Sequence, residues 1–435
     1  MSALEQLGAF AANYRPDERA RAAVRRHVAD TIGAWIAGAG TQEGRALAAL
    51  RTPGAPLPDR IAINCAMTRL SEVDDIHLGA MVTPGAIVVP AALTIGAGVG
   101  ADAGEVTAAV VAGYEAMIRF GAAIDGPTVL YRGIWPTYFA APLGVAAVAA
   151  RLLKLDERKA AHALAHAFIM LTPGTGHHAA VSTARWLAVG YAAARGWQAA
   201  LAAQAGFTSD LKLADGDFLK NIYGIAPTMA VLREGLGEFA LHQTSFKPWC
   251  AARQTMAATQ ALKEILAQGV PADSISAIEA AVLPPHLKMI DHGVTPGDRF
   301  SHLTSLQYQM AVAALTPDAA YDVAGPAGAV SPVLQAFMAR IKLRPDEALL
   351  AAGYPKTWAA NVVVTSASGR YERRATQVPG DPAFAGGEAD LKAKFARVAA
   401  SVLSDGRTDA MYAHALNALH RPADVLAALE QIGGS

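Results

Sequence analysis

The feature that most constrains the fold is the segment 78–101, which contains no charged side chain. As a helix, this segment is long enough to span a bilayer. However, it contains Pro84, Pro90 and several Gly and Thr residues, and it lacks the dense Leu, Ile and Phe of a membrane-spanning helix. We therefore predict a helix buried in a large helical core, within a soluble, cytoplasmic protein.

The composition narrows the class of protein and of partner. The 435 residues include 37 basic and 37 acidic side chains, so the chain has no net field to attract nucleic acid or an anionic membrane. Hydrophobic residues make up 53% and charged residues only 17%, which argues against disorder and predicts that part of the surface is hidden in an oligomer. Cys65 and Cys250 are too few for a disulfide framework and indicate a reducing compartment.

The first half of the chain has the start and stop signals of successive helices. Residues 17–38 begin with acidic side chains and end near glycine, and 105–124 and 156–170 repeat this pattern. Two alanine-dense segments, 144–153 and 189–205, carry small residues that let helices approach closely. The sequence therefore predicts a helical bundle up to about residue 235.

From about residue 242 the pattern becomes mixed. Residues 276–283 and the β-branched segment 360–366 predict strands, and a Ser-Gly turn leads from the second strand into 370–377 as a hairpin. Helices are predicted between them, at 253–268 and 305–314.

After this segment the helical pattern returns over 389–403. The predicted fold class is therefore mostly α, with a large helical domain and an inserted, smaller α+β lid domain. The helical domain is predicted over 1–241 and 383–435, and the lid domain over 242–382.

Two motifs resemble ligand sites but lack the context that such sites need. Residues 173–179 match G-x-G-x-x-A, yet no strand precedes them and no acidic residue follows at the right distance, so we predict no nucleotide site. His162 and His166 have the i, i+4 spacing of metal ligands, but no carboxylate lies between them and their helix is otherwise apolar. Packed histidines are predicted there, and no metal site.

Three segments place polar groups in strongly apolar surroundings. Residues 72–77 put three acids and a histidine directly before the uncharged segment, an arrangement that is costly unless these groups are paired. They predict either a cleft with shifted pKa values or an exposed capping turn. The second segment is 132–137. The third is 246–250, followed by Arg253, at the junction between the predicted domains, where small-molecule pockets are common.

Together these segments resemble the MmgE/PrpD family, which includes 2-methylcitrate dehydratase, cis-aconitate decarboxylase and iminodisuccinate epimerase. The resemblance runs almost end to end. It implies the fold predicted above, a homodimer, and carbanion chemistry beside a carboxylate without a metal or an organic cofactor. The similar segments are 28–38, 72–77, 83–93, 133–155, 183–190, 247–250 and 305–308.

The sequence also departs from the family pattern. Thr83 and Trp135 stand where the family has histidines that serve proton transfer or substrate binding, and Arg185 replaces a lysine. Glu72 replaces the first aspartate of the D-x-D-D motif. These replacements predict an altered specificity. The matching positions are Asp74, Asp75, Lys247 and Tyr308.

The resemblance and the local chemistry together assign candidate roles. Lys247 lies beside apolar residues that can lower its pKa, and we expect it to act as a base or acid. Tyr308 could donate to an enolate oxygen, and Asp75, with His77, could orient a partner or act as a base. Arg185 suits bidentate carboxylate binding. The other predicted substrate contacts are Glu72, Asp74, Thr83, Trp135 and Arg253.

Three functions are compatible with the sequence. The first is a cofactor-independent lyase, of the dehydratase or decarboxylase type, that acts on a small di- or tricarboxylate through a carbanion or enolate. The second is an epimerase or isomerase that returns the proton to the same carbanion. The third is a non-catalytic member that binds a metabolite, which the two replaced histidines favour.

Overall fold

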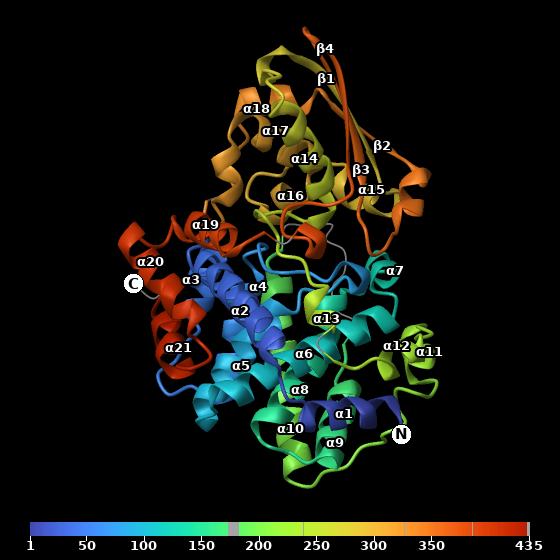
Figure 1. Cartoon of the computed structure of the whole chain (residues 1–435), viewed down its shortest axis with the longest axis vertical. Coiled ribbons are helices and arrows are strands. Elements are labelled where there is room, and N and C mark those ends of the chain that lie inside the picture. The colour runs from blue at the N-terminus through green and yellow to red at the C-terminus, as the bar shows by residue number, and fades with distance from the viewer. Residues whose placement is uncertain (173–181, 238, 326, 385, 433–435) are drawn as a thin grey trace.

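A computed structural model describes residues 1–172, 182–237, 239–325, 327–384 and 386–432. The chain is mostly helical, with a smaller α+β region that stands above the helices in Figure 1. The G-x-G-x-x-A segment at 173–179 lies outside the described residues.

The helical region is built from both ends of the chain. Its helices are α1 (Ala3–Asn13), α2 (Glu18–Ala39), α3 (Gln42–Ala48), α4 (Leu57–Arg69), α5 (Gly85–Val99), α6 (Ala103–Ala123), α7 (Gly126–Tyr131), α8 (Pro136–Leu152), α9 (Glu157–Ile169), α10 (Ala184–Gln204), α11 (Phe218–Tyr223), α12 (Met229–Arg233), α13 (Phe239–His242), α19 (Glu388–Ala399), α20 (Asp405–Leu416) and α21 (Pro422–Gln431).

The alanine-dense helices α8 and α10 lie at the centre of this region, as predicted. α8 packs against α6 and α10, and α10 also packs against α4. Glycine makes these approaches possible, because a Cβ at Gly190 would lie 2.0 Å from the carbonyl oxygen of Ala62, and one at Gly196 would lie 2.4 Å from that of Pro142. Small residues therefore set the distance between the central helices.

The uncharged segment forms the buried helix predicted for it, but the helix is shorter than the segment. α5 begins only at Gly85 and is buried as far as Gly96. Before it, a short 3-10 turn (Leu78–Ala80) and a bridge between His77 and Val82 turn the chain back. α6 is the one described helix that is long and apolar enough to cross a membrane by length and composition alone, and most of it is buried inside the protein.

The α+β region contains the strands β1 (Ile275–Val282), β2 (Ile341–Pro345), β3 (Ala360–Ser366) and β4 (Gly369–Ala375), in the order β2-β1-β3-β4. β1 is parallel to β2 and antiparallel to β3, and β3 and β4 form the predicted hairpin. β2 was not predicted. The helices of this region are α14 (Arg253–Leu266), α15 (Pro284–Ile290), α16 (Arg299–Thr304), α17 (Leu306–Leu315) and α18 (Pro332–Met338).

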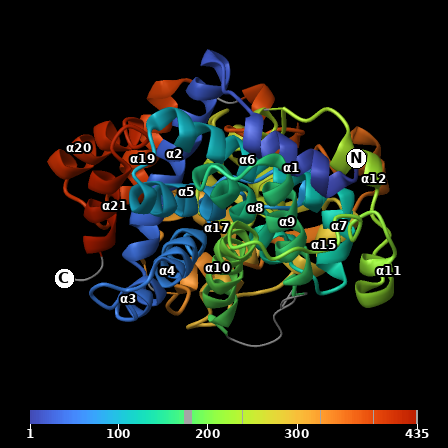
Figure 2. The ribbon, with the colours of Figure 1, turned by 90° about the horizontal axis from the view of Figure 1, so that it is seen from below.

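After the sheet the chain returns to the helical region. α19 and α20 pack against α2, and α21 packs against α5. Figure 2 shows these C-terminal helices together on one side of the bundle. The domain boundaries at 241–242 and 382–383 stay predictions.

The two histidines with metal-ligand spacing hold a loop. The backbone N–H of Ser209 donates to His162 Nδ1 at 3.2 Å, and His166 Nε2 lies 3.1 Å from the carbonyl oxygen of Phe207. Both side chains of α9 therefore fix the segment that follows α10.

Candidate active site

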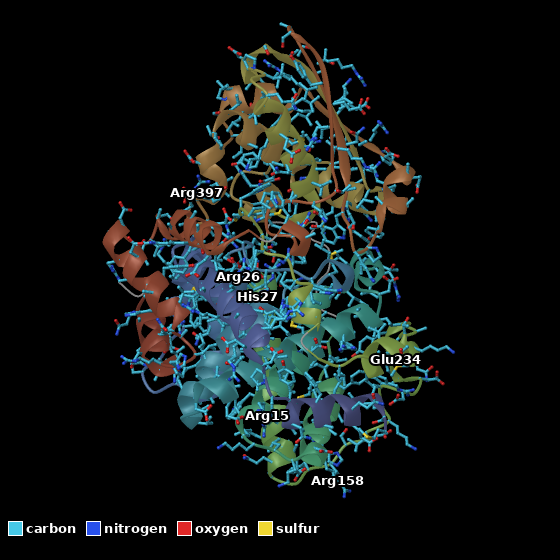
Figure 3. All side chains as sticks on the ribbon, in the orientation of Figure 1. Arg15, Arg26, His27, Arg158, Glu234 and Arg397 are labelled. Atoms are coloured by element: carbon cyan, nitrogen blue, oxygen red, sulfur yellow. The ribbon has the colours of Figure 1, made fainter. Side chains whose placement is uncertain are left out.

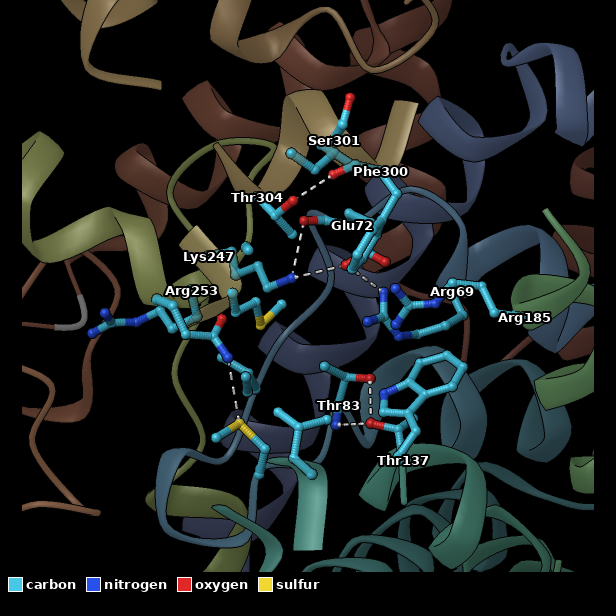
Figure 4. Close-up of a pocket in the computed structure, with 18 of the residues that line it drawn as sticks. Arg69, Glu72, Thr83, Thr137, Arg185, Lys247, Arg253, Phe300, Ser301 and Thr304 are labelled. Carbon is cyan, nitrogen blue, oxygen red and sulfur yellow. Dashed lines mark hydrogen bonds and ion pairs between the residues drawn. The ribbon is translucent and has the colours of Figure 1, made fainter. Parts of the chain in front are cut away.

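A cavity of about 680 Å³ lies between the helical region and the α+β region. Figure 4 shows the side chains of Arg69, Glu72 and Lys247 directed toward one another, and the guanidinium of Arg253 pointing away from them. The helical region supplies Arg69, Glu72, Thr83, Trp135, Thr137 and Arg185 to its lining. The other wall includes Lys247, Arg253, Lys288, His292, Asp298 and Phe300.

An unusual backbone turn brings Glu72 to this cavity. α4 ends at Arg69, and Glu72 then adopts a left-handed conformation with a φ of 58°. For a residue with a Cβ this conformation costs about 1–2 kcal/mol. The turn places the Glu72 carboxylate 2.9 Å from Arg69 and presents the Glu72 carbonyl oxygen to Lys247 Nζ at 3.0 Å.

Five buried ionisable side chains form what we call the charged cluster: Arg69, Glu72, Asp74, Arg185 and Lys247. Arg69 lies 2.9 Å from Glu72 and 3.3 Å from Asp74. Lys247 Nζ lies 3.6 Å from Glu72 and 3.8 Å from Asp74. Two of the three cations therefore share the same two carboxylates.

Burial shifts the protonation of this cluster. It lowers the pKa of Lys247, although Asp74 and Glu72 oppose this shift. At a given pH, a larger fraction of Lys247 is therefore the neutral amine than in water. Burial also raises the pKa of Asp74 to about 6, against the effect of Arg69 and Lys247. Burial alone would raise the pKa of Glu72 as well, but Arg69, Lys247 and Arg185 together lower it.

Arg185 differs from the other cations because its hydrogen-bonding capacity is not used. It lies in the first turn of α10, with its guanidinium 4.4 Å from the ring centroid of Trp135 and 4.3 Å from that of Phe300. Burial lowers the pKa of Arg185 to about 10. Its Nε and Nη1 atoms are buried and have no hydrogen-bond partner among the residues that the structure describes. Two donors therefore remain for a ligand.

The Thr83 hydroxyl and the Trp135 indole occupy the two positions where the family resemblance would place histidines, and Thr83 lies beside Thr137. The Thr83 backbone N–H donates to Thr137 Oγ1 at 3.1 Å, and the two hydroxyl oxygens lie 3.2 Å apart. Trp135 packs against Arg185 and, at 5.2 Å, against Arg69. Trp135 lines the cavity without filling it.

Arg253 lines the cavity with its charge already paired. Its Nη2 donates to both carboxylate oxygens of Asp381, at 2.9 and 2.8 Å. This ion pair is buried. Arg253 is therefore a wall residue whose charge Asp381 offsets.

Asp75, predicted to be catalytic, is not among the residues that line the cavity. Its Oδ2 lies 2.8 Å from His27 Nδ1 and accepts from the Tyr114 hydroxyl at 2.6 Å, while its Oδ1 accepts from the Gly85 backbone N–H at 2.7 Å. Figure 3 labels His27 on α2. These contacts join α2 and α6 to the first turn of α5, so the geometry gives Asp75 a structural role.

His77 and Tyr308 also lie outside this lining. His77 Nδ1 accepts from the Ala80 backbone N–H at 3.1 Å, and burial lowers the pKa of His77 to about 4. Tyr308 lines a smaller cavity of about 220 Å³, together with Cys250 and Arg299. The structure therefore brings Lys247 and Arg185 together but not Asp75, His77 or Tyr308.

Arg69 and Phe300 are two of the lining residues that sequence reasoning missed, and Thr137 is another. Arg69 precedes Glu72 by three positions, a spacing that favours an ion pair, and this was the available signal. Phe300 had no signal, because nothing in the sequence places its ring against a distant guanidinium.

Two family models match the sequence of this chain. The MmgE/PrpD N-terminal domain matches residues 61–221, and the MmgE/PrpD C-terminal domain matches residues 249–418. The chain belongs to the MmgE/PrpD family. MmgE/PrpD proteins are generally dehydratases and related enzymes, which supports an enzyme of this general type. No curated protein matches the chain.

The cavity of this MmgE/PrpD protein lies where the two matched segments meet. Arg69 and Arg185 belong to the first segment and Phe300 to the second, while Lys247 precedes the second by two residues. Both halves of the family signature therefore contribute to one pocket.

Proposed function

We propose that the protein is a cofactor-independent lyase, of the dehydratase or decarboxylase type, that acts on a small carboxylate through an enolate. The sequence predicted a di- or tricarboxylate as the substrate of this protein, with a specificity that differs from that of the familiar family members. The observation that carries this proposal is the pair of unpaired, buried donors on Arg185 in the same charged cluster as Lys247.

Binding of a substrate carboxylate follows from the state of Arg185. A buried cation with unused donors is costly, and a carboxylate offers two oxygens that match the planar guanidinium. Trp135 and Phe300 both pack against this guanidinium, so its unpaired donors, Nε and Nη1, are the part left for the ligand. This arrangement orients the carbon next to the carboxylate.

Lys247 is the group we assign to proton transfer. As the neutral amine it takes a proton from the carbon next to the bound carboxylate, and the electron pair of the broken C–H bond forms the enolate. Arg185 stabilises the charge that develops on the carboxylate oxygens. In a dehydration, this electron pair forms the C=C bond, and the hydroxyl on the next carbon takes the proton from the Lys247 ammonium and departs as water.

The same groups also support the decarboxylase variant of this reaction. There the C–C bond to the departing CO₂ breaks, its electron pair forms the enolate of a second carboxylate that Arg185 holds, and the ammonium of Lys247 donates a proton to carbon. Thr83 and Thr137 could donate to a leaving hydroxyl, but their hydroxyls are too weakly basic to remove a carbon-bound proton at neutral pH. The proton transfer at carbon is therefore assigned to Lys247.

The test compares Lys247→Met with Lys342→Met, which changes an exposed lysine of β2. Citrate, methylcitrate, aconitate, malate and aminodicarboxylates are incubated with each protein in D₂O, and products are followed by NMR. We expect Lys247→Met to lower the turnover of an identified substrate about 10²- to 10⁴-fold, the usual size of general acid–base catalysis. The control should match the wild type.

Each other outcome contradicts a defined part of the proposal. Wild-type turnover by Lys247→Met would make the assignment of the base wrong. Deuterium that enters recovered substrate without an unsaturated product would favour an epimerase. An acid that binds without exchange or turnover would favour a non-catalytic, metabolite-binding protein.

A further inference from the structure

We propose that the substrate presents a single carboxylate to the charged cluster and carries an apolar chain along the rest of the cavity. This inference rests on the proposed function and narrows its substrate class. It retains the dehydratase variant only, because the decarboxylation described above needs a second carboxyl group. It replaces the di- or tricarboxylate predicted from the sequence with a monocarboxylate that has an aliphatic substituent.

The first step is the charge of the cluster itself. Arg69 and Lys247 each contact both Glu72 and Asp74, so these two cations and two carboxylates offset one another. Among the described residues, Arg185 forms no ion pair. With Lys247 as the ammonium, the three cations exceed the two carboxylates by one charge, and one ligand carboxylate offsets it. In the neutral-amine form assigned to the base, the unused donors of Arg185 hold the ligand.

The second step is that the described lining residues offer no second buried cation without an ion-pair partner. Arg253 Nε and Nη1 are also buried without a hydrogen-bond partner among the described residues, but Asp381 offsets the charge of Arg253. Figure 4 shows the Arg253 guanidinium pointing away from Arg69, Arg185 and Lys247. Lys288 is exposed, where water solvates its ammonium, and Asp298 adds a negative charge to the same side of the cavity. A second or third carboxylate placed deep in the cavity would lose its hydration without gaining an unpaired buried cation, which is unfavourable.

The third step is the apolar part of the wall. Ile76, Met81 and Leu130 line the cavity from one side, and Met289 and Leu303 line it from the other. A volume of about 680 Å³ lies within the range of pockets that enclose drug-sized ligands. A short polycarboxylate would leave this apolar wall in contact with water, whereas an aliphatic chain would cover it.

The experiment measures binding by calorimetry for pairs of acids with equal chain length. Butanoate, hexanoate and octanoate are compared with succinate, adipate and suberate, and citrate is added as the tricarboxylate. We expect each monocarboxylate to bind more tightly than its dicarboxylate partner. Affinity should rise about fourfold with each added methylene until the wall is covered.

Two variants assign this binding to the cavity. Arg185→Gln should abolish binding of every acid, while Arg370→Gln, which changes an exposed arginine of β4, should leave binding unchanged. Met81→Ser should weaken octanoate more than butanoate, because it changes the wall and not the cation. Thermal unfolding of each variant shows whether it is folded.

The outcomes separate this inference from the proposed function. Dicarboxylates or citrate that bind as tightly as the matched monocarboxylates would overturn the inference and leave the lyase proposal standing. Arg185-dependent binding of long monocarboxylates, with no exchange or turnover of any carboxylate in D₂O, would support the inference and contradict the lyase. Binding that Arg185→Gln leaves intact would contradict both.

Discussion

Asp74 and Asp75 are neighbours in the chain, both fully buried, and their surroundings differ completely. Asp75 accepts from three groups on three elements and uses both of its oxygens. Asp74 faces Arg69 and Lys247 through one oxygen, and its Oδ2 has no hydrogen-bond partner in the described part of the chain. One carboxylate completes a network, and the other belongs to a network that is incomplete.

This difference separates the framework from the site. A fully satisfied buried network stabilises one arrangement of the helices, whereas unused donors and acceptors are costly until something pairs with them. The unpaired atoms of Asp74 and Arg185 lie in the charged cluster, beside the cavity. Both carboxylate oxygens of Asp75, by contrast, have hydrogen-bond partners. We therefore expect that removing the Asp75 carboxylate destabilises the protein, whereas neutralising Asp74 increases its relative stability at neutral pH.

The largest effect is expected for Asp75→Ala. It leaves His27, Tyr114 and the Gly85 N–H without their buried acceptor, so the free energy of unfolding should fall by about 3–5 kcal/mol. Tyr114→Phe removes one of these contacts and should cost about 1–2 kcal/mol. Urea denaturation measures both. A stable Asp75→Ala protein that has lost only its activity would reverse the assignment and restore the predicted catalytic role of Asp75.

The second prediction concerns the pH dependence of stability at Asp74, which faces Arg69, Glu72, Lys247 and Asp75. Burial raises its pKa from 3.8 to about 6, so its stabilising contribution is full below pH about 4 and is lost as pH rises through about 6. Asp74→Asn does not titrate there. Its free energy of unfolding, relative to the wild type, should therefore be about 2–3 kcal/mol higher at pH 7 than at pH 4.

Urea denaturation at both pH values checks this prediction. Asp273→Asn, at an exposed carboxylate of the α+β region, is the matched control and should show no such change with pH. If the free energies of unfolding of Asp74→Asn and the wild type differed equally at both pH values, Asp74 would titrate normally. Its protonation would then not distinguish it from Asp75.

The smallest effect is expected at the neutral pair beside the cluster. Thr137→Val keeps the shape of the side chain but removes the acceptor of the Thr83 N–H, which should cost about 1 kcal/mol of stability. If the hydroxyl pair also donates to the leaving group, kcat should fall while KM stays nearly unchanged. Steady-state kinetics and urea denaturation separate the two effects. An unchanged kcat would assign the pair to the framework alone.

The fold was largely predictable because its signals are local. The uncharged segment predicted a buried helix, and the strand predicted at 276–283 is found at Ile275–Val282. β2, Ile341–Pro345, was missed because it is an edge strand of only five residues that ends in a proline, so the alternation of apolar and charged residues over 341–344 is too short to indicate a strand by itself. The parallel pairing with β1 that defines it is a tertiary contact.

The site was predictable only in part, because its decisive contacts join distant segments. Lys247 and Arg185 were identified, and both line the cavity. Nothing in the sequence showed that Asp74 would face the charged cluster while Asp75 faced α2 and α6. The partners of Asp75 are His27 and Tyr114, which lie 48 and 39 residues away. Their choice depends on the helix packing rather than on the acidic motif.

The contact of Arg185 with two aromatic rings links ligand binding to the packing of the helical region against the α+β region. Trp135 precedes α8 in the helical region, whereas Phe300 lies on α16 in the α+β region. Neither region alone can enclose the guanidinium, so separation of the two would return one of its faces to water. If a carboxylate pairs with Arg185 as proposed, its affinity is a property of the assembled pair of regions, and the bound ligand holds the two together.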